Sequence, residues 1–218
     1  MASRPYALTV LAADPDRLGL FWRDLLGEHD VPIPLVFTKA DLPRQGLNQI
    51  HFHLTSYTAT QQENVDRALS LGATHLDVGQ LPDEDHVVLA DPEGNEFCVI
   101  ESTNNWLAGT GFLGEVAADG TREVGLFWSA ALDWPLVHDE DGETAIRTPD
   151  GRMLIAWGGP PLNDKSARNK MHLVLVTTDD LDDEVQRLVA LGATEVGRSG
   201  DAVELADPDG NEFWLRPA

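Results

Sequence analysis

Two strand-like runs of this chain carry histidine, a side chain that can ligate a divalent metal. The run "NQIHFHLTS" holds His51 and His53, and the run "NKMHLVLVTTD" holds His172. Because side chains alternate along a strand, His51 and His53 lie on the same face. Such a pair could belong to a metal site, and it is as easily explained as the polar wall of a cleft. No serine stands in a nucleophile-elbow pattern and no glycine-rich phosphate loop occurs, so acyl chemistry is not supported.

The elements that must position these histidines are indicated by a turn that the chain contains twice. "LADPEGNEFCVIE" begins at Leu89 and "LADPDGNEFWLRPA" begins at Leu205. Asp, Pro and Gly at the first, second and fourth positions suit a type I turn whose last residue takes a positive φ. Runs rich in β-branched residues flank each turn, so each copy predicts a strand, a turn and a second strand.

Other motifs repeat in the same order. "LGAT" occurs at Leu71 and Leu191, each time closing a helix-like stretch, and "GLFW" occurs at Gly19 and Gly125 inside amphipathic stretches. Each helix-like stretch follows one strand-like run and precedes others. The sequence therefore predicts an α+β chain of four strand-helix-strands units, in the order a, b, a, b. We expect Trp22 and Trp128, at the end of the two "GLFW" motifs, to be core residues.

Composition limits the possible partners. The chain has 218 residues, 42% of them hydrophobic, which is enough for two modest domains, and the break is expected near residues 102–111. No stretch is apolar enough to cross a bilayer and no signal-peptide pattern opens the chain, so we expect a cytoplasmic protein without membrane contact. One cysteine excludes an internal disulfide framework. A net charge of −22 argues against nucleic acid as a partner.

The repeated units resemble the vicinal oxygen chelate superfamily, which includes glyoxalase I, extradiol dioxygenases, fosfomycin-modifying enzymes and bleomycin-resistance proteins. A histidine on the first strand and a hairpin written "DPxGN" before the last strand carry this resemblance, as do "LADPEGNEFCVI" and "HLVLVTTDDLDDEVQRLVALGAT". It covers nearly the whole chain. It implies four βαβββ modules in two tandem glyoxalase-like domains, residues 1–102 and 103–218. Because many chemistries share this scaffold, the resemblance predicts the fold better than the activity.

The resemblance also implies where metal ligands would stand, on the first and last strands of each module. Counting from the turns places these positions at Ala7, near Phe37, His51 and Cys98 in the first domain, and at Phe112, Ile155, His172 and Trp214 in the second. The customary carboxylates are missing from both domains. The first expectation is therefore that no metal is bound. The alternative is a zinc-like site of His51, His53 and Cys98 in domain one, because a catalytic site needs about three protein ligands. Domain two is expected to be metal-free.

The strand after each repeated turn is expected to face the ligand. Alternation places Glu96, Cys98 and Ile100 on the cleft side of the first copy and Glu212, Trp214 and Arg216 on that of the second. Trp214 and Arg216 would offer a stacking plane and a fixed cation to an aromatic or carboxylate-bearing ligand. Arg216 could equally be a solvated strand end. Trp157 lies two residues after Ile155 and so on the same face of its strand, which leaves a cleft role open to it. No specific role is expected for the turn histidines, which are His29, His75, His86 and His138.

These observations predict a protein that binds a small organic molecule in sheet-lined clefts. It would act without a metal, either as a binding or sequestering protein of the bleomycin-resistance type or as an enzyme on a natural product. The alternative is a divalent-metal lyase, isomerase or dioxygenase centred on His51. Modules a and b are expected to pair within each half of the chain. Because the tandem repeat already supplies two modules per cleft, we expect a monomer or a homodimer.

Overall fold

The computed structural model describes residues 3–42, 46–81, 84–163, 165 and 167–218. The chain contains four groups of elements in the predicted order, two in each half. Its first unit consists of β1 (Arg4–Ala12), α1 (Pro15–Leu26) and β2 (Leu35–Lys39). Its second unit consists of β3 (Ile50–Leu54), α2 (Gln61–Ser70), β4 (Thr74–His75), β5 (Val87–Ala90) and β6 (Glu96–Val99). Among the described residues, the first unit therefore has one strand after its helix where the resemblance implies three.

The second half contains two complete strand-helix-three-strand units. The third unit consists of β7 (Leu113–Ala118), α3 (Arg122–Leu132), β8 (Leu136–Glu140), β9 (Glu143–Arg147) and β10 (Leu154–Trp157). The fourth unit consists of β11 (Met171–Thr177), α4 (Leu181–Leu191), β12 (Thr194–Ser199), β13 (Ala202–Ala206) and β14 (Glu212–Pro217). The mixed α+β fold of tandem units is confirmed. Within the described residues no helix is long and apolar enough to cross a membrane.

Local sequence signals account for the helix boundaries. Thr60 caps α2 in a reciprocal capping box, in which its hydroxyl accepts from the Glu63 amide and the Glu63 carboxylate accepts from the Thr60 amide at 2.8 Å. Asp180 caps α4 by accepting from the amides of Asp182 and Asp183. Gly192 ends α4 with a φ of 123°, a conformation that glycine adopts without steric cost.

The strands form a six-stranded sheet, in the order β12-β13-β14-β11-β1-β2, and an eight-stranded sheet, in the order β4-β5-β6-β3-β7-β10-β9-β8. The six-stranded sheet joins the first unit to the fourth, since β1 pairs with β11 antiparallel and Leu8 faces Leu173. The eight-stranded sheet joins the second unit to the third, since β3 pairs with β7 antiparallel and His51 faces Ala117.

The prediction that modules a and b pair within each half is therefore wrong. Both sheets cross from one half of the chain to the other. The equivalent units carry the same hydrophobic alternation, so the first strand of one unit has a suitable partner in more than one other unit. Nothing in that pattern specifies which partner is used.

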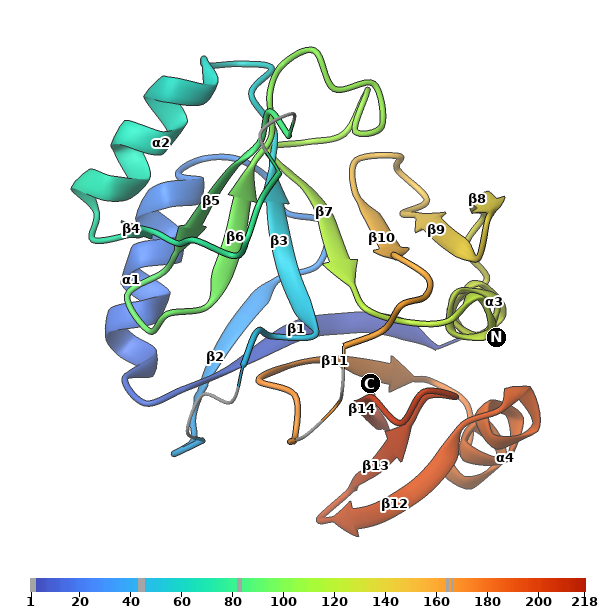
Figure 1. The fold of residues 1–218 in the computed structure, drawn as a ribbon. Coiled ribbons are helices and arrows are strands. Elements are labelled where there is room, and N and C mark those ends of the chain that lie inside the picture. The colour runs from blue at the N-terminus through green and yellow to red at the C-terminus, as the bar shows by residue number, and fades with distance from the viewer. Residues whose placement is uncertain (1–2, 43–45, 82–83, 164, 166) are drawn as a thin grey trace.

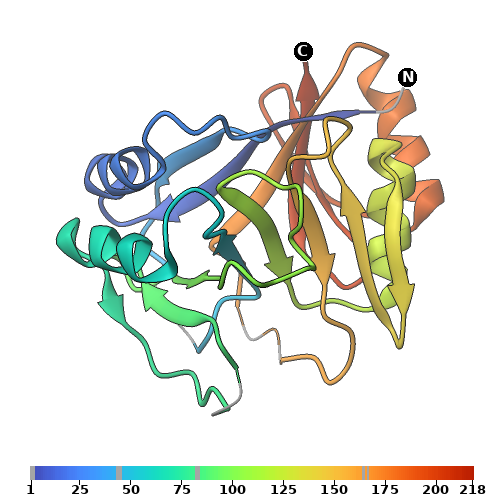
Figure 2. The ribbon, with the colours of Figure 1, turned by 90° about the horizontal axis from the view of Figure 1, so that it is seen from above.

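Each half is nevertheless held together by its helices, which lie in pairs at opposite ends of the molecule, α1 beside α2 and α3 beside α4 (Figures 1 and 2). In the first half, Trp22 of α1 packs edge-on against Phe52 and Phe97, with ring centroids 5.0 and 5.1 Å apart. In the second half, Trp128 lies 4.9 Å from Phe213. Trp22 is 1% exposed and Trp128 is 5% exposed, so the prediction that both are core residues is confirmed.

The two tryptophans also bind the repeated turns. Trp22 Nε1 donates to Asp91 and Trp128 Nε1 donates to Asp207, both at 3.2 Å. The glycine of the second "GLFW" motif permits close packing of α3 on β9, because a Cβ at Gly125 would stand 2.0 Å from Thr144 Oγ1. The repeated motifs thus connect helix a to hairpin b in each half, while the sheets connect the halves to each other.

Three of the positions implied by the resemblance belong to the core. Phe37 packs against α1 at Gly19, and Phe112 and Ile155 are 6% and 4% exposed in the main hydrophobic cluster. Register explains these misplacements. Phe37 pairs with Val10 and Ile155 pairs with Val116, and both partners are buried in the same hydrophobic cluster. A shift of one residue along a strand moves a side chain to the other face of the sheet.

Candidate functional site

A cleft of about 440 Å³ lies over the eight-stranded sheet. Strands β3, β7 and β10, together with the segment between the two halves, supply most of its walls. Its lining side chains include His51, His53, His86, Ile100, Asn104, Trp106, Leu107, Glu115, Asp119, Glu143 and Trp157. The cleft therefore lies between the second and third units, one from each half of the chain.

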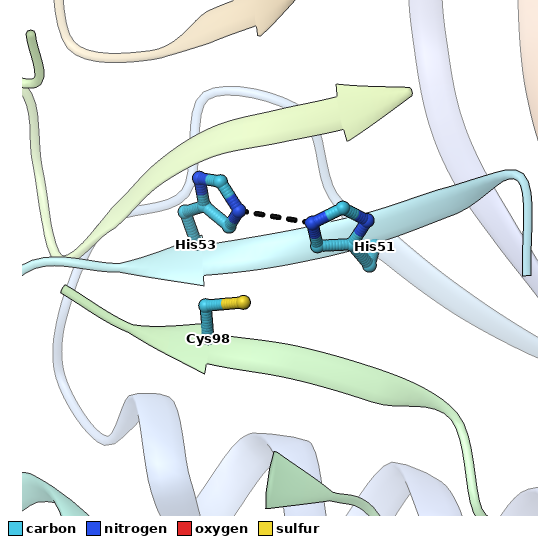
Figure 3. A group of neighbouring side chains, drawn as sticks. All are labelled: His51, His53 and Cys98. Atoms are coloured by element: carbon cyan, nitrogen blue, oxygen red, sulfur yellow. Dashed lines mark hydrogen bonds between the residues drawn. The ribbon is translucent and has the colours of Figure 1, made fainter. Parts of the chain in front are cut away.

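Three possible metal donors converge at this cleft (Figure 3). His51 and His53 project from β3, and Cys98 projects from β6, where it pairs with His53. Their donor atoms all lie within 4.8 Å of one another. Nε2 of His51 is 3.0 Å from Nε2 of His53. No other group of three such donors is found this close together in the described part of the chain.

A buried carboxylate orients one of these donors. Glu115 Oε2 on β7 lies 2.5 Å from His53 Nδ1, and the Glu115 side chain is only 3% exposed. The other carboxylate oxygen, Oε1, accepts from Trp106 Nε1 at 2.7 Å. This arrangement fixes the His53 ring with Nε2 toward His51 and Cys98. A carboxylate behind a histidine is the usual way in which proteins orient a metal-ligating imidazole.

The two histidines have opposite electrostatic environments. Burial, and then the charges of His53 and His86, lower the pKa of His51 to about 3. Burial alone would also lower the pKa of His53, but hydrogen bonds with Cys98 and Glu115 outweigh it and raise that pKa to about 10. In the metal-free protein a protonated His53 therefore donates to the Glu115 carboxylate and to a neutral His51 ring.

Sequence reasoning missed several residues of this cleft. Glu115 stands alone as a charge in the apolar run "FLGEVAA", which was a usable signal because an isolated carboxylate in a buried strand needs a partner. Trp106 lies in the segment that was interpreted only as a break between domains. His86 lines the cleft, and His138 of β8 lies edge-on to Trp106 at 5.0 Å, although no role was expected for either histidine.

The candidates from the second repeat are placed differently. His172 on β11 lines a cavity of about 40 Å³, where Trp157 is also found, and its Nδ1 is buried without a hydrogen-bond partner among the described residues. Burial, and then the charge of Arg168, lower its pKa to about 4. Trp157 is 4% exposed and borders both this cavity and the main cleft.

Trp214 and Arg216 lie on β14 of the six-stranded sheet, away from the donor cluster. Trp214 pairs with Val174 of β11 and is half-buried. The Arg216 guanidinium stands 4.0 Å above the ring of Tyr6, which comes from the first half of the chain. The structure thus brings His51, His53 and Cys98 together, places Trp157 at the same cleft, and separates Trp214 and Arg216 from them.

The donor set of the cleft fits a divalent metal of the zinc type. Two imidazole nitrogens and one thiolate sulfur are borderline and soft donors, which zinc prefers, whereas magnesium and calcium require oxygen. Ala117 and Ala156 pair across β7 and β10, and Ala117 also pairs with His51, so these two positions place only methyl groups beside the donors.

The fold has close counterparts among solved structures. Glyoxalase I from Zea mays superposes with a TM-score of 0.62 at 16% identity, covering 99% of this chain and 92% of that one. A "putative dioxygenase" from Bacillus subtilis superposes with a TM-score of 0.55 at 15% identity, covering 99% of this chain and 85% of that one. At these identities the similarity establishes the fold alone. A search of curated proteins finds no significant match.

Two tandem matches to a glyoxalase-like family model, together with the paired units and the two sheets, define a vicinal oxygen chelate protein with two repeats. Within that superfamily the chain belongs to the Glyoxalase-like domain family, which matches residues 7–100 and 115–216. The resemblance drawn from the sequence is confirmed.

Proposed function

We propose that this protein binds a small organic molecule in the cleft of the eight-stranded sheet, beside a divalent metal ion held by His51, His53 and Cys98. The convergence of three donor atoms within 4.8 Å carries the proposal. The carboxylate of Glu115 behind His53 supports it, because metal sites depend on such partners to orient their ligands. This is the alternative that the sequence left open, and it is favoured over metal-free binding because the geometry of the donors is already assembled.

The types of the three donor atoms limit the reactions that a bound metal could catalyse. A bound ion with open positions would act as a Lewis acid toward an oxygen atom of the ligand. Cys98 stands where a carboxylate would complete the two-histidine, one-carboxylate set of non-haem iron oxygenases. Lyase or isomerase chemistry on a carbonyl-containing molecule is therefore preferred to dioxygenase chemistry.

The protein residues around the donors would bind and orient the ligand. A volume of about 440 Å³ is within the ordinary range for small-molecule sites. Ile100 and Leu107 give one part of the cleft an apolar wall, while Asp119 and Glu143 line it with groups that accept hydrogen bonds or attract a positive charge. We infer a ligand with an apolar portion, an oxygen near the donor cluster and a hydrogen-bond donor at the acidic part.

A metal-free binding protein is the second candidate, and one observation favours it. His51 and His53 are hydrogen-bonded to each other and His53 also to Glu115, so these rings have partners without an ion. In that case the cleft would sequester its ligand, as the bleomycin-resistance type does, or would act on a natural product with protein groups alone.

Elemental analysis of protein purified without chelator distinguishes the two candidates. We expect about one zinc-type ion per chain. His51→Ala and Cys98→Ala should lose it, because two remaining ligands do not retain an ion through purification. His172→Ala is the matched control, since His172 is the corresponding histidine of the second repeat, and this variant should keep the ion.

The metal proposal fails if the wild-type protein holds no stoichiometric ion and takes up none of zinc, nickel, manganese or iron when these are added. It also fails if His51→Ala retains the ion. Metal-free binding is then the remaining function, and a thermal-shift screen of small molecules would identify its ligand, since a ligand that binds only the folded state raises the melting temperature.

A further inference from the structure

The segment between the two repeats, residues 101–111, forms part of the cleft wall. Leu107, 1% exposed, anchors it in a small apolar cluster that also contains Cys98 and Ile100. Asn104 fixes the turn before the anchor, since its side chain accepts from the Leu107 amide at 3.1 Å and its carbonyl accepts from the Tyr57 hydroxyl at 2.9 Å. The segment therefore has a defined conformation and presents Trp106 next to the anchor.

Trp106 combines exposure with a buried polar contact. Its side chain is among the exposed large hydrophobic groups, at 39%, and it lines the cleft. Its Nε1 donates at 2.7 Å to Glu115 Oε1, an atom of a carboxylate that is almost fully buried. A tryptophan held only by packing has no need of this contact, since the indole N–H could reach water from so exposed a position.

We propose that Trp106 is a positioning residue of the donor cluster and acts through Glu115. This inference rests on the proposed metal-binding function. A carboxylate can rotate about its last side-chain bond, and Glu115 must keep Oε2 directed at His53 Nδ1. The indole N–H holds Oε1, which leaves Oε2 in place for His53. His53 in turn keeps Nε2 directed at the metal position, so a residue of the inter-repeat segment sets the orientation of a ligand on β3.

The ring of Trp106 has a second consequence for the same site. Because it lines the cleft and is partly exposed, it can contact a ligand that lies against the cleft wall. A ligand stacked there would press on the residue that positions Glu115. Ligand binding and the orientation of His53 would therefore be coupled through one side chain.

Trp106→Phe is the decisive variant, because it keeps an aromatic ring in the segment and removes only the N–H donor and the second ring. Cobalt(II) is the probe, since its absorption reports both the thiolate contact and the geometry of the site. We expect wild-type protein to show a sulfur-to-cobalt charge-transfer band. Trp106→Phe should weaken cobalt binding about tenfold, as loss of an outer-shell partner does, and should alter the visible bands. Trp134→Phe is the control, since Trp134 borders a separate cavity, and should leave both unchanged.

A double-mutant cycle tests the route through Glu115. Glu115→Ala should weaken cobalt binding at least as much as Trp106→Phe. Adding Trp106→Phe to Glu115→Ala should then cause no further loss, because the indole has no carboxylate left to hold. The proposal would be overturned if Trp106→Phe weakened cobalt binding equally in the wild-type protein and in Glu115→Ala. It would also be overturned if Trp106→Phe alone kept the wild-type cobalt affinity and spectrum. Thermal melting of the metal-free variants verifies that each is folded.

The metal-free protein gives a readout that does not depend on the ion. The hydrogen bond between His53 and Glu115 should give a downfield imidazole N–H proton resonance, and Trp106→Phe should shift it or remove it by exchange with water. If wild-type protein binds no cobalt, the proposed metal function fails, and this resonance still decides the role of Trp106. An unchanged resonance in Trp106→Phe would overturn that role.

Discussion

The role of Trp214 depends on how deeply its side chain is buried. It stands where metal-containing relatives are expected to carry a carboxylate, yet it lies on the six-stranded sheet, half-buried beside Val174. Its neighbour on the same face, Arg216, is the cation above Tyr6. The expectation that this pair binds an aromatic or carboxylate-bearing ligand stays a prediction. Arg216 already has a partner from the first half of the chain in Tyr6.

Truncation of Trp214 should therefore have a moderate effect on stability. We expect Trp214→Ala to lower the free energy of unfolding by about 1–2 kcal/mol, less than the ~3–5 kcal/mol typical of a fully buried tryptophan, because part of the indole is already in contact with water. The metal content should not change, since the donor cluster lies on the other sheet. Urea midpoints measure the first effect and elemental analysis the second. A loss of 3 kcal/mol or more would identify Trp214 as a core residue.

At the residue scale, the sequence identified the three metal donors better than the residues that orient them. Alternation along a strand placed His51 and His53 on one face, and position after the repeated turn added Cys98, and these three side chains do converge. Glu115 and Trp106 could not be assigned in this way, because their contacts join β7 and the inter-repeat segment to β3. Such contacts follow from the pairing of β3 with β7, which no local pattern specifies.

At the scale of the elements, the repeated "DPxGN" hairpin depends on one buried aspartate in each copy. Asp91 accepts from the amides of Glu93 and Asn95, both at 2.9 Å, from the Asn95 side chain, and from Trp22. Burial raises the pKa of Asp91, although these donors act in the opposite direction. The motif was recognisable as a turn from its residue types, but its contact with the "GLFW" helix required the three-dimensional arrangement.

Removal of this aspartate should destabilise the protein strongly. Asp91→Ala leaves several buried N–H groups without an acceptor, which we expect to lower the free energy of unfolding by about 3 kcal/mol. Asp207→Ala should have a similar effect, because Asp207 has the equivalent contacts with Asn211 and Trp128. Glu93→Ala serves as the control and should cost about 1 kcal/mol, since its carboxylate accepts from the amides of Ala13 and Asp14 in an exposed place. Denaturant unfolding gives all three values. Equal losses in Asp91→Ala and Glu93→Ala would contradict a special role for the buried turn.

At the scale of the whole molecule, the two repeats are interlocked. The helices of each half pack together, while β1 pairs with β11 and β3 pairs with β7 across the halves. The sequence predicted the four units and their order because each unit repeats its own turn and helix signals. It could not predict the exchange of partners, since equivalent units present equivalent strands. The cleft with the donor cluster exists only because the exchange brings β3 and β7 together.

Separation of the halves should consequently abolish the native monomer. In residues 1–102 alone, β1 and β3 would each lose one neighbouring strand and expose a long unpaired edge, which favours association with another copy. We expect this fragment to be an oligomer or poorly folded, and we expect co-expression with residues 103–218 to restore a one-to-one complex with the full chain's circular dichroism spectrum. The intact chain, in which both sheets are completed internally, should be monomeric. Light scattering after size exclusion measures each state. A cooperatively folded monomer of residues 1–102 would show that the first half is an independent domain and that pairing across the halves is not needed for folding.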